Sequence, residues 1–148
     1  MKQYETSHLV KGEDLNHHGT LFAARAAGWL VEAAFVAAGC TCGTSEGIVC
    51  RNLHHMSFRK PVHKGAIVRF AARVVYVGKS SFTVMVTGAD AMDGECRMEG
   101  MITFVTIDEA GGKRAHGICL DAAADENERR QRERASAEME ALRSTGGK

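Results

Sequence analysis

The sequence predicts an α+β fold in which one long buried helix is wrapped by an antiparallel β-sheet. The helix is indicated by an apolar, alanine-rich run over residues 21–38 that contains no proline, and alanine is the best helix former. A strand-like segment precedes this run, and four segments rich in β-branched and aromatic residues follow it. One helix packed on one antiparallel sheet is a common layered arrangement.

The first strand is expected at residues 4–10, where Tyr, Thr and Val mix with polar residues, and residues 11–14 form a turn. The helix over residues 21–38 would be about 27 Å long at roughly 1.5 Å per residue. It is apolar on all sides apart from Arg25 and Glu32, so we expect it to be buried. Gly39 is expected to be the left-handed residue that ends it.

Four strands are expected after a polar loop over residues 40–47. In one of them Phe82, Val84 and Val86 alternate with polar residues and Met85, which is typical of a hairpin strand. Turns before and after it are indicated by Gly78-Lys79-Ser80 and Asp93-Gly94. The four predicted ranges are 48–58, 66–77, 81–88 and 96–108.

The C-terminal part differs in composition from the rest. Residues 121–143 lack an apolar stripe but carry acid-to-base pairs four residues apart, such as Glu126–Arg130 and Glu128–Arg132, which support an exposed helix. Alternatively, the arginines of this segment form a cluster that binds a phosphate group of a ligand held by a neighbouring subunit. We therefore expect a domain over residues 1–118 and a charged helical tail over residues 119–148, with residues 146–148 disordered.

The composition favours an ordinary globular protein. The chain has 148 residues and a net charge of +1, which suits one domain and gives no electrostatic case for nucleic acid as a partner. No charge-free apolar run reaches eighteen residues, and the first residues do not resemble a signal peptide. We therefore expect a cytoplasmic protein without a membrane partner.

The cysteines and histidines do not indicate a metal site. Five cysteines lack the two-residue spacing of zinc or redox motifs, so they are expected to be reduced thiols. The adjacent pairs His17-His18 and His54-His55 would chelate poorly, because neighbouring residues on a strand point to opposite faces. We expect neither a metal nor another cofactor.

Glu32 and the start of the helix are the candidate site. A buried carboxylate is costly unless it is paired or hydrogen-bonded, so Glu32 is either satisfied by neighbouring donors or held for chemistry. Asn16, His18 and Thr20 place polar groups just before the first helical turn. The free N–H groups of that turn form a ready site for an oxyanion.

Residues 16–32 resemble the signature of the hotdog-fold acyl-CoA thioesterases, and particularly their acyl-CoA hydrolase branch. The branch pattern Asn-x-x-Gly-x-x-Phe-Gly-Gly, followed by Trp-Met and an acid, is matched at Asn16, Gly19, Phe22 and Trp29. The chain departs from it in two ways. The Gly-Gly pair falls on alanines, and the acid falls on a valine, with a glutamate one residue later; these positions are Ala23, Ala24, Val31 and Glu32.

Two further segments extend the resemblance over about residues 4–118. Phe58-x-x-Pro61-Val62 followed by Gly65 matches the branch pattern that leads into a glycine turn, and Gly78 to Ser81 matches a Gly-x-Ser-Ser pattern. The resemblance implies that the protein hydrolyses an acyl-CoA to a carboxylic acid and CoA. It also implies a homodimer, which in this family often assembles further into tetramers or hexamers.

The resemblance implies specific roles for residues of the candidate site. Backbone amides near Ala23 would hold the thioester carbonyl, Asn16 would orient water or the thioester, and Glu32 of a second subunit would supply the acid. His18 and Thr20 would support these groups or, alternatively, cap the helix, with Thr20 as the capping residue. Arg51 and Asn52 are further polar candidates. Coenzyme A would be bound by basic groups and a backbone turn: Arg59, Lys60, Gly78, Lys79, Ser80 and Ser81.

Two other functions remain open at this point. Because the family acid position is Val31, the chain could instead be a non-hydrolytic acyl-CoA-binding or regulatory hotdog protein. A hotdog hydratase or dehydratase is a third alternative, but we find no Asp and His in a hydration motif. Binding without turnover identifies the second function, and thiol release separates the first from the third.

Overall fold

The computed structural model describes residues 1–146 as two helices, a short 3₁₀ turn at Gly12–Asp14 and five strands. The helices are α1 (Ala23–Cys42) and α2 (Glu126–Gly146). The strands are β1 (Tyr4–Leu9), β2 (Ile48–Phe58), β3 (Ile67–Val77), β4 (Ser81–Asp90) and β5 (Cys96–Thr106). The predicted order of one strand, one helix and four strands is confirmed.

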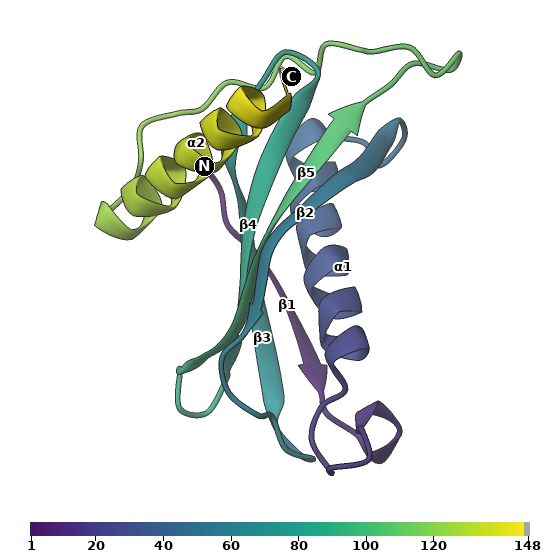
Figure 1. Cartoon of the computed structure of the whole chain (residues 1–148), viewed down its shortest axis with the longest axis vertical. Helices are drawn as coiled ribbons and strands as arrows, with labels where there is room; N and C mark the ends of the chain where they lie inside the picture. Colours follow the sequence, from purple (N-terminus) through teal and green to yellow (C-terminus); the bar gives the residue numbers. More distant parts are fainter. Residues whose placement is uncertain (147–148) are drawn as a thin grey trace.

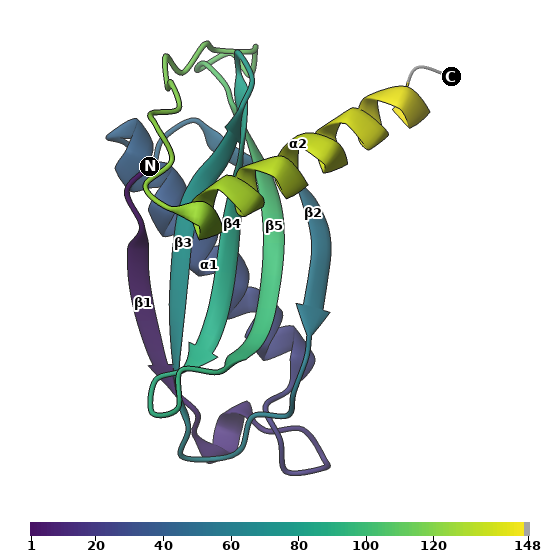
Figure 2. The ribbon, with the colours of Figure 1, turned by 90° about the vertical axis from the view of Figure 1, so that its left-hand side faces the viewer.

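The strands form a single antiparallel sheet in the order β1-β3-β4-β5-β2. The strands β1 and β2 are therefore the two edges. Figure 1 shows α1 along one face of the sheet and α2 across the other, and Figure 2 shows α2 crossing the strands diagonally. The strand ranges differ from prediction only at some ends: β4 extends to Asp90 and β5 stops at Thr106.

The helix α1 begins and ends later than its sequence predicts. Its first residue is Ala23 rather than Leu21, because the Leu21 N–H donates to the carbonyl of Val62 and ties that residue to a neighbouring segment. Gly39 is helical, so its predicted role as the terminating residue is wrong. The left-handed residue is Gly43, with φ of 76°, whose N–H bonds back to the Gly39 carbonyl.

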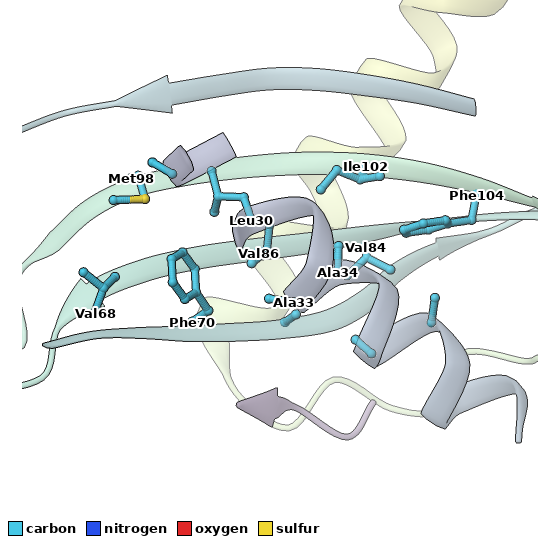
Figure 3. Close-up of a cluster of buried hydrophobic side chains, with 14 of the residues drawn as sticks. Leu30, Ala33, Ala34, Val68, Phe70, Val84, Val86, Met98, Ile102 and Phe104 are labelled. Atoms are coloured by element: carbon cyan, nitrogen blue, oxygen red, sulfur yellow. The ribbon is translucent and has the colours of Figure 1, made fainter. Parts of the chain in front are cut away.

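The prediction that α1 is buried on all sides is also wrong for the single chain. One stripe, consisting of Ala26, Leu30, Ala33, Ala34, Ala37 and Ala38, is buried. This stripe packs on a sheet face built from β3, β4 and β5 (Figure 3), whereas Arg25, Gly28 and Glu32 on the opposite side of the helix are exposed. By length and composition α1 could span a membrane, but a core helix packed on a sheet has the same properties.

The tail helix α2 is docked rather than solvated. Ala135 is fully buried against Val75, Met85 and Met101 on the outer sheet face. The rest of the contact is polar, and includes a hydrogen bond from Arg73 to Gln131 (2.8 Å). Because the surface of α2 that contacts the sheet is largely polar, the sequence of this helix shows no apolar stripe. Residues 146–148 were expected to be disordered. Residue 146 is helical, and residues 147–148 lie outside the described residues.

Candidate functional site

The loop before α1 is organised by the side chain of Asn16. Its Oδ1 accepts hydrogen bonds from the backbone N–H groups of His18 (2.9 Å) and Thr20 (3.2 Å) and from the Thr20 hydroxyl. The Thr20 N–H and hydroxyl are therefore directed at Asn16, and the residue that caps α1 is Phe22, without a side-chain bond. The capping role predicted for Thr20 is wrong, and Thr20 instead supports the loop.

A hollow of about 240 Å³ lies beside the first turn of α1. Ala23 lines it, together with Thr20 from the loop and residues 58–62 from the segment after β2. The first intrahelical hydrogen bond runs from the Ala26 N–H to the Phe22 carbonyl, so the Ala23 amide has no acceptor in a preceding turn. The Ala23 amide is therefore without an intrahelical acceptor beside this hollow.

Arg59 and Lys60 lie at this hollow, but both are paired. Arg59 contacts the Glu99 carboxylate at 2.6 Å, and Lys60 contacts Glu95. Burial acts to raise the pKa of Glu99, but the hydrogen bond from Arg59 and the charge of Arg134 outweigh it and lower the pKa. A phosphate that binds Arg59 must therefore compete with an ionised carboxylate.

The Gly78–Ser81 turn lies at the opposite end of the sheet. Across the sheet, Phe58 pairs with Met98, Met98 with Gly88 and Gly88 with Phe70. Arg59 follows Phe58, so it lies close to the level of Phe70, in the first half of β3. Eight residues of β3 separate that level from Gly78, which is about 26 Å at roughly 3.3 Å per residue. Within one chain, the two predicted groups of CoA-binding residues therefore cannot contact the same part of a ligand.

The predicted turn is instead part of another surface. Gly78 and Ser81 line a hollow of about 610 Å³ together with Met139 and Leu142 of α2. The carbonyls of Lys79 and Ser80 accept hydrogen bonds from the backbone N–H groups of His116 and Thr106.

Glu32 is exposed and does not line the hollow beside Ala23. About 65% of its side chain is accessible, and its Oε1 lies 3.9 Å from Nε2 of His8 on β1. The His8 ring stacks on Trp29 with centroids 4.4 Å apart. The expectation of a buried Glu32 is therefore wrong for the single chain, in which Val31 packs against the core instead.

The remaining predicted residues lie away from the hollow. Arg51 and Asn52 are exposed on the edge strand β2, where the register shifts between Cys50 and Asn52. The ring of His18 lies against that of His17, with centroids 3.8 Å apart and the two planes tilted by 42°. Residues 1–146 contain no cluster of three or more His, Cys, Asp or Glu side chains arranged to hold a metal.

Two residues near the helix start were not predicted from the sequence. Asp14 is buried; its Oδ2 accepts the Lys11 N–H (2.8 Å) and its Oδ1 lies 3.3 Å from Arg25 Nε. Asp14 is therefore a buried carboxylate satisfied by neighbouring donors, which was one of the two alternatives for Glu32. Met98 of β5 lines the hollow; its inward position follows from the alternation of β5, although nothing in the sequence links it to α1.

A long helix wrapped by an antiparallel sheet, with an apolar hollow at the helix start, defines a hotdog protein. The chain belongs to the thioesterase superfamily, whose family model matches residues 18–97, more than half of the chain. No curated protein matches the sequence.

Solved structures give the same fold. The chain resembles an acyl-CoA hydrolase from Staphylococcus aureus, solved with butyryl coenzyme A and coenzyme A, with TM-score 0.85 and 24% identity over 97% of this chain and 85% of that one. It also resembles a hexameric acyl-CoA thioesterase (TM-score 0.83, 23% identity, 97% and 92% coverage). A third match is an acyl-CoA hydrolase from Bacillus cereus, with TM-score 0.81 and 20% identity over 98% of this chain and 90% of that one.

Proposed function

We propose that the protein is an acyl-CoA thioesterase that hydrolyses an acyl-CoA to a free carboxylic acid and coenzyme A. The observation that carries this proposal is the hollow beside the first turn of α1. There, in a member of the thioesterase superfamily, the Ala23 amide and an apolar cavity lie together next to the Asn16 loop.

The chemistry needs an acceptor for a proton and donors for a developing oxyanion. Water attacks the thioester carbonyl while a carboxylate takes its proton, and the Ala23 amide stabilises the negative oxygen. The C–S bond then breaks, and the leaving thiolate takes up a proton. Because Glu32 of the same chain lies next to His8, we propose that Glu32 of a second copy supplies this carboxylate.

The proposed assembly is a homodimer, with further association into a tetramer or hexamer. The edge strand β2 exposes Val49, Leu53 and Phe58, and the first half of α1 exposes Ala23, Ala24 and Gly28. A second copy would cover these apolar groups and add strands to the free edge.

The separation of Arg59 from the Gly78 turn also supports a dimer, since two chains together would surround one CoA molecule.

Thiol release from a panel of acyl-CoAs tests the proposal, with Glu32→Gln measured beside the natural protein. We expect turnover in the natural protein and a loss of about two orders of magnitude or more in the variant, as for removal of a general base. Glu13→Gln is the control, since Glu13 is an exposed acid that contacts Lys11. Unchanged turnover in Glu32→Gln would place the acid elsewhere, and binding without turnover in the natural protein would contradict hydrolysis.

A further inference from the structure

The hollow beside the first turn of α1 has a floor of buried apolar side chains. Met98, Val62 and Ala26 line it and are only 2%, 5% and 2% exposed. Figure 3 shows Met98 on the inner face of the sheet, among the side chains that pack under α1. The polar groups Thr20, Arg59 and Lys60 also line the hollow and are more exposed than these three residues. An occupant that is apolar at one end and polar at the other therefore fits this site.

The size of the hollow limits such an occupant. Its volume of about 240 Å³, at roughly 30 Å³ per small group, accommodates about eight methylene-sized groups. Ala23 lines the same hollow, so a chain attached to a carbonyl held by the Ala23 amide would enter it directly. We propose, on the basis of the proposed thioesterase function, that this hollow binds the acyl chain and that Met98 limits it to about eight carbons.

Met98 cannot easily move aside for a longer chain. Its Cγ lies only 2.8 Å from the position that a Cβ atom on Gly88 would occupy, and Phe70 closes the same spot at 2.9 Å. The side chain therefore packs directly against the backbone of β4 and an aromatic ring, in a core with little free volume. Replacement of Met98 by Ala removes Cγ, Sδ and Cε and leaves room for about two more methylenes, provided that the cavity does not collapse.

The test is a series of straight-chain acyl-CoAs from acetyl- to palmitoyl-CoA, assayed for kcat/KM by thiol release and for affinity by calorimetry. In the natural protein we expect kcat/KM to rise about fourfold per methylene within the hollow and to fall beyond octanoyl-CoA. In Met98→Ala the optimum should move to chains about two carbons longer. Met98→Val, which removes less of the side chain, should give a shift about half as large and is available if the alanine variant does not fold.

Met101→Ala is the matched control. Met101 lies on the same strand and is equally buried at 2% exposure, but it packs on the outer face with Val75, Met85 and Ala135. The Met101→Ala variant should be less stable than the natural protein, but its chain-length optimum should not shift. An unchanged optimum in both Met98 variants, or an equal shift in Met101→Ala, would overturn the proposal. Affinity that follows chain length and shifts in Met98→Ala, without thiol release, would support the acyl site and contradict hydrolysis.

Discussion

Asn16 has a structural role that its place in a catalytic motif does not show. Its carboxamide oxygen accepts two backbone N–H groups and a hydroxyl within five residues of chain. The loop that it closes is fixed to its surroundings, because the Leu21 N–H donates to Val62 and the Phe22 N–H to Asp14. The orientation of the first turn of α1, and hence of the Ala23 amide, therefore depends on Asn16.

Asn16→Ala should consequently affect both stability and turnover. Loss of the shared acceptor should lower the free energy of unfolding by about 1–2 kcal/mol, and kcat/KM should fall with it. Asn16→Asp keeps Oδ1, so it should retain more of the stability. Urea unfolding of the two variants measures the difference. Equal stability of natural protein and Asn16→Ala would show that these bonds do not hold the loop.

Single residues were predictable from the sequence where the motif is local. Ala23, Arg59 and Lys60 line the hollow at the start of α1, and Asn16 lies in the loop that precedes the helix. Glu32 was placed wrongly because its environment depends on which side of α1 faces β1, and a helix that is apolar all round does not reveal that side. The distance from Arg59 to the Gly78 turn follows from sheet register, which the sequence does not give.

At the scale of elements, a buried carboxylate of α2, that of Glu128, links the helix to β3, because its Oε1 lies 3.7 Å from Nη1 of Arg73. Glu128 is fully buried and contacts the Met1 ammonium (2.7 Å), Arg132 (2.7 Å) and the Ala124 N–H (2.9 Å). Burial opposes ionisation, but these three donors outweigh it and lower the pKa of Glu128 to about 2. The stability that this carboxylate provides is present above its ordinary pKa and is lost as the pH falls towards 2.

We therefore expect α2 to stay docked down to about pH 4.5 and to loosen between about pH 4.5 and 2. Hydrogen exchange of residues 126–146, corrected for the intrinsic effect of pH, measures this. Glu128→Gln should exchange faster than the natural protein at neutral pH and should lose most of the dependence over that range. Exchange in the natural protein that is unaffected by acid would rule out Glu128 as the anchor.

The positions of the elements were predictable because their patterns are periodic, whereas the docking of α2 was not. Strand β2 has the predicted bounds, and the bounds of β3, β4 and β5 differ from prediction by a few residues at most. In α2, Ala135 is the one apolar residue that is fully buried. Ion pairs and hydrogen bonds from β2, β3 and β5 make up much of the remaining contact, including those with Glu138, Gln131 and Arg134. Such contacts are set by partners distant in sequence, and no local pattern predicts them.

At the scale of the whole molecule, the proposed catalytic groups lie apart from one another in the single chain. Ala23 and the Asn16 loop lie at the start of α1, whereas Glu32 lies farther along the helix and next to His8. If the active site is formed by two copies, one copy contributes Asn16 and the other contributes Glu32. Each site of a symmetric dimer would then contain one residue from each chain.

Mixing two inactive variants tests this arrangement. Asn16→Ala and Glu32→Gln should each have little activity alone. After unfolding and refolding together in equal amounts, half of the dimers should contain both variants, and each of these should have one site with both natural residues. About one quarter of the natural turnover should therefore return. Recovery should disappear when the variants are mixed without exchange of subunits. No recovery from a mixture shown to contain mixed dimers would mean that Asn16 and Glu32 do not meet across two chains.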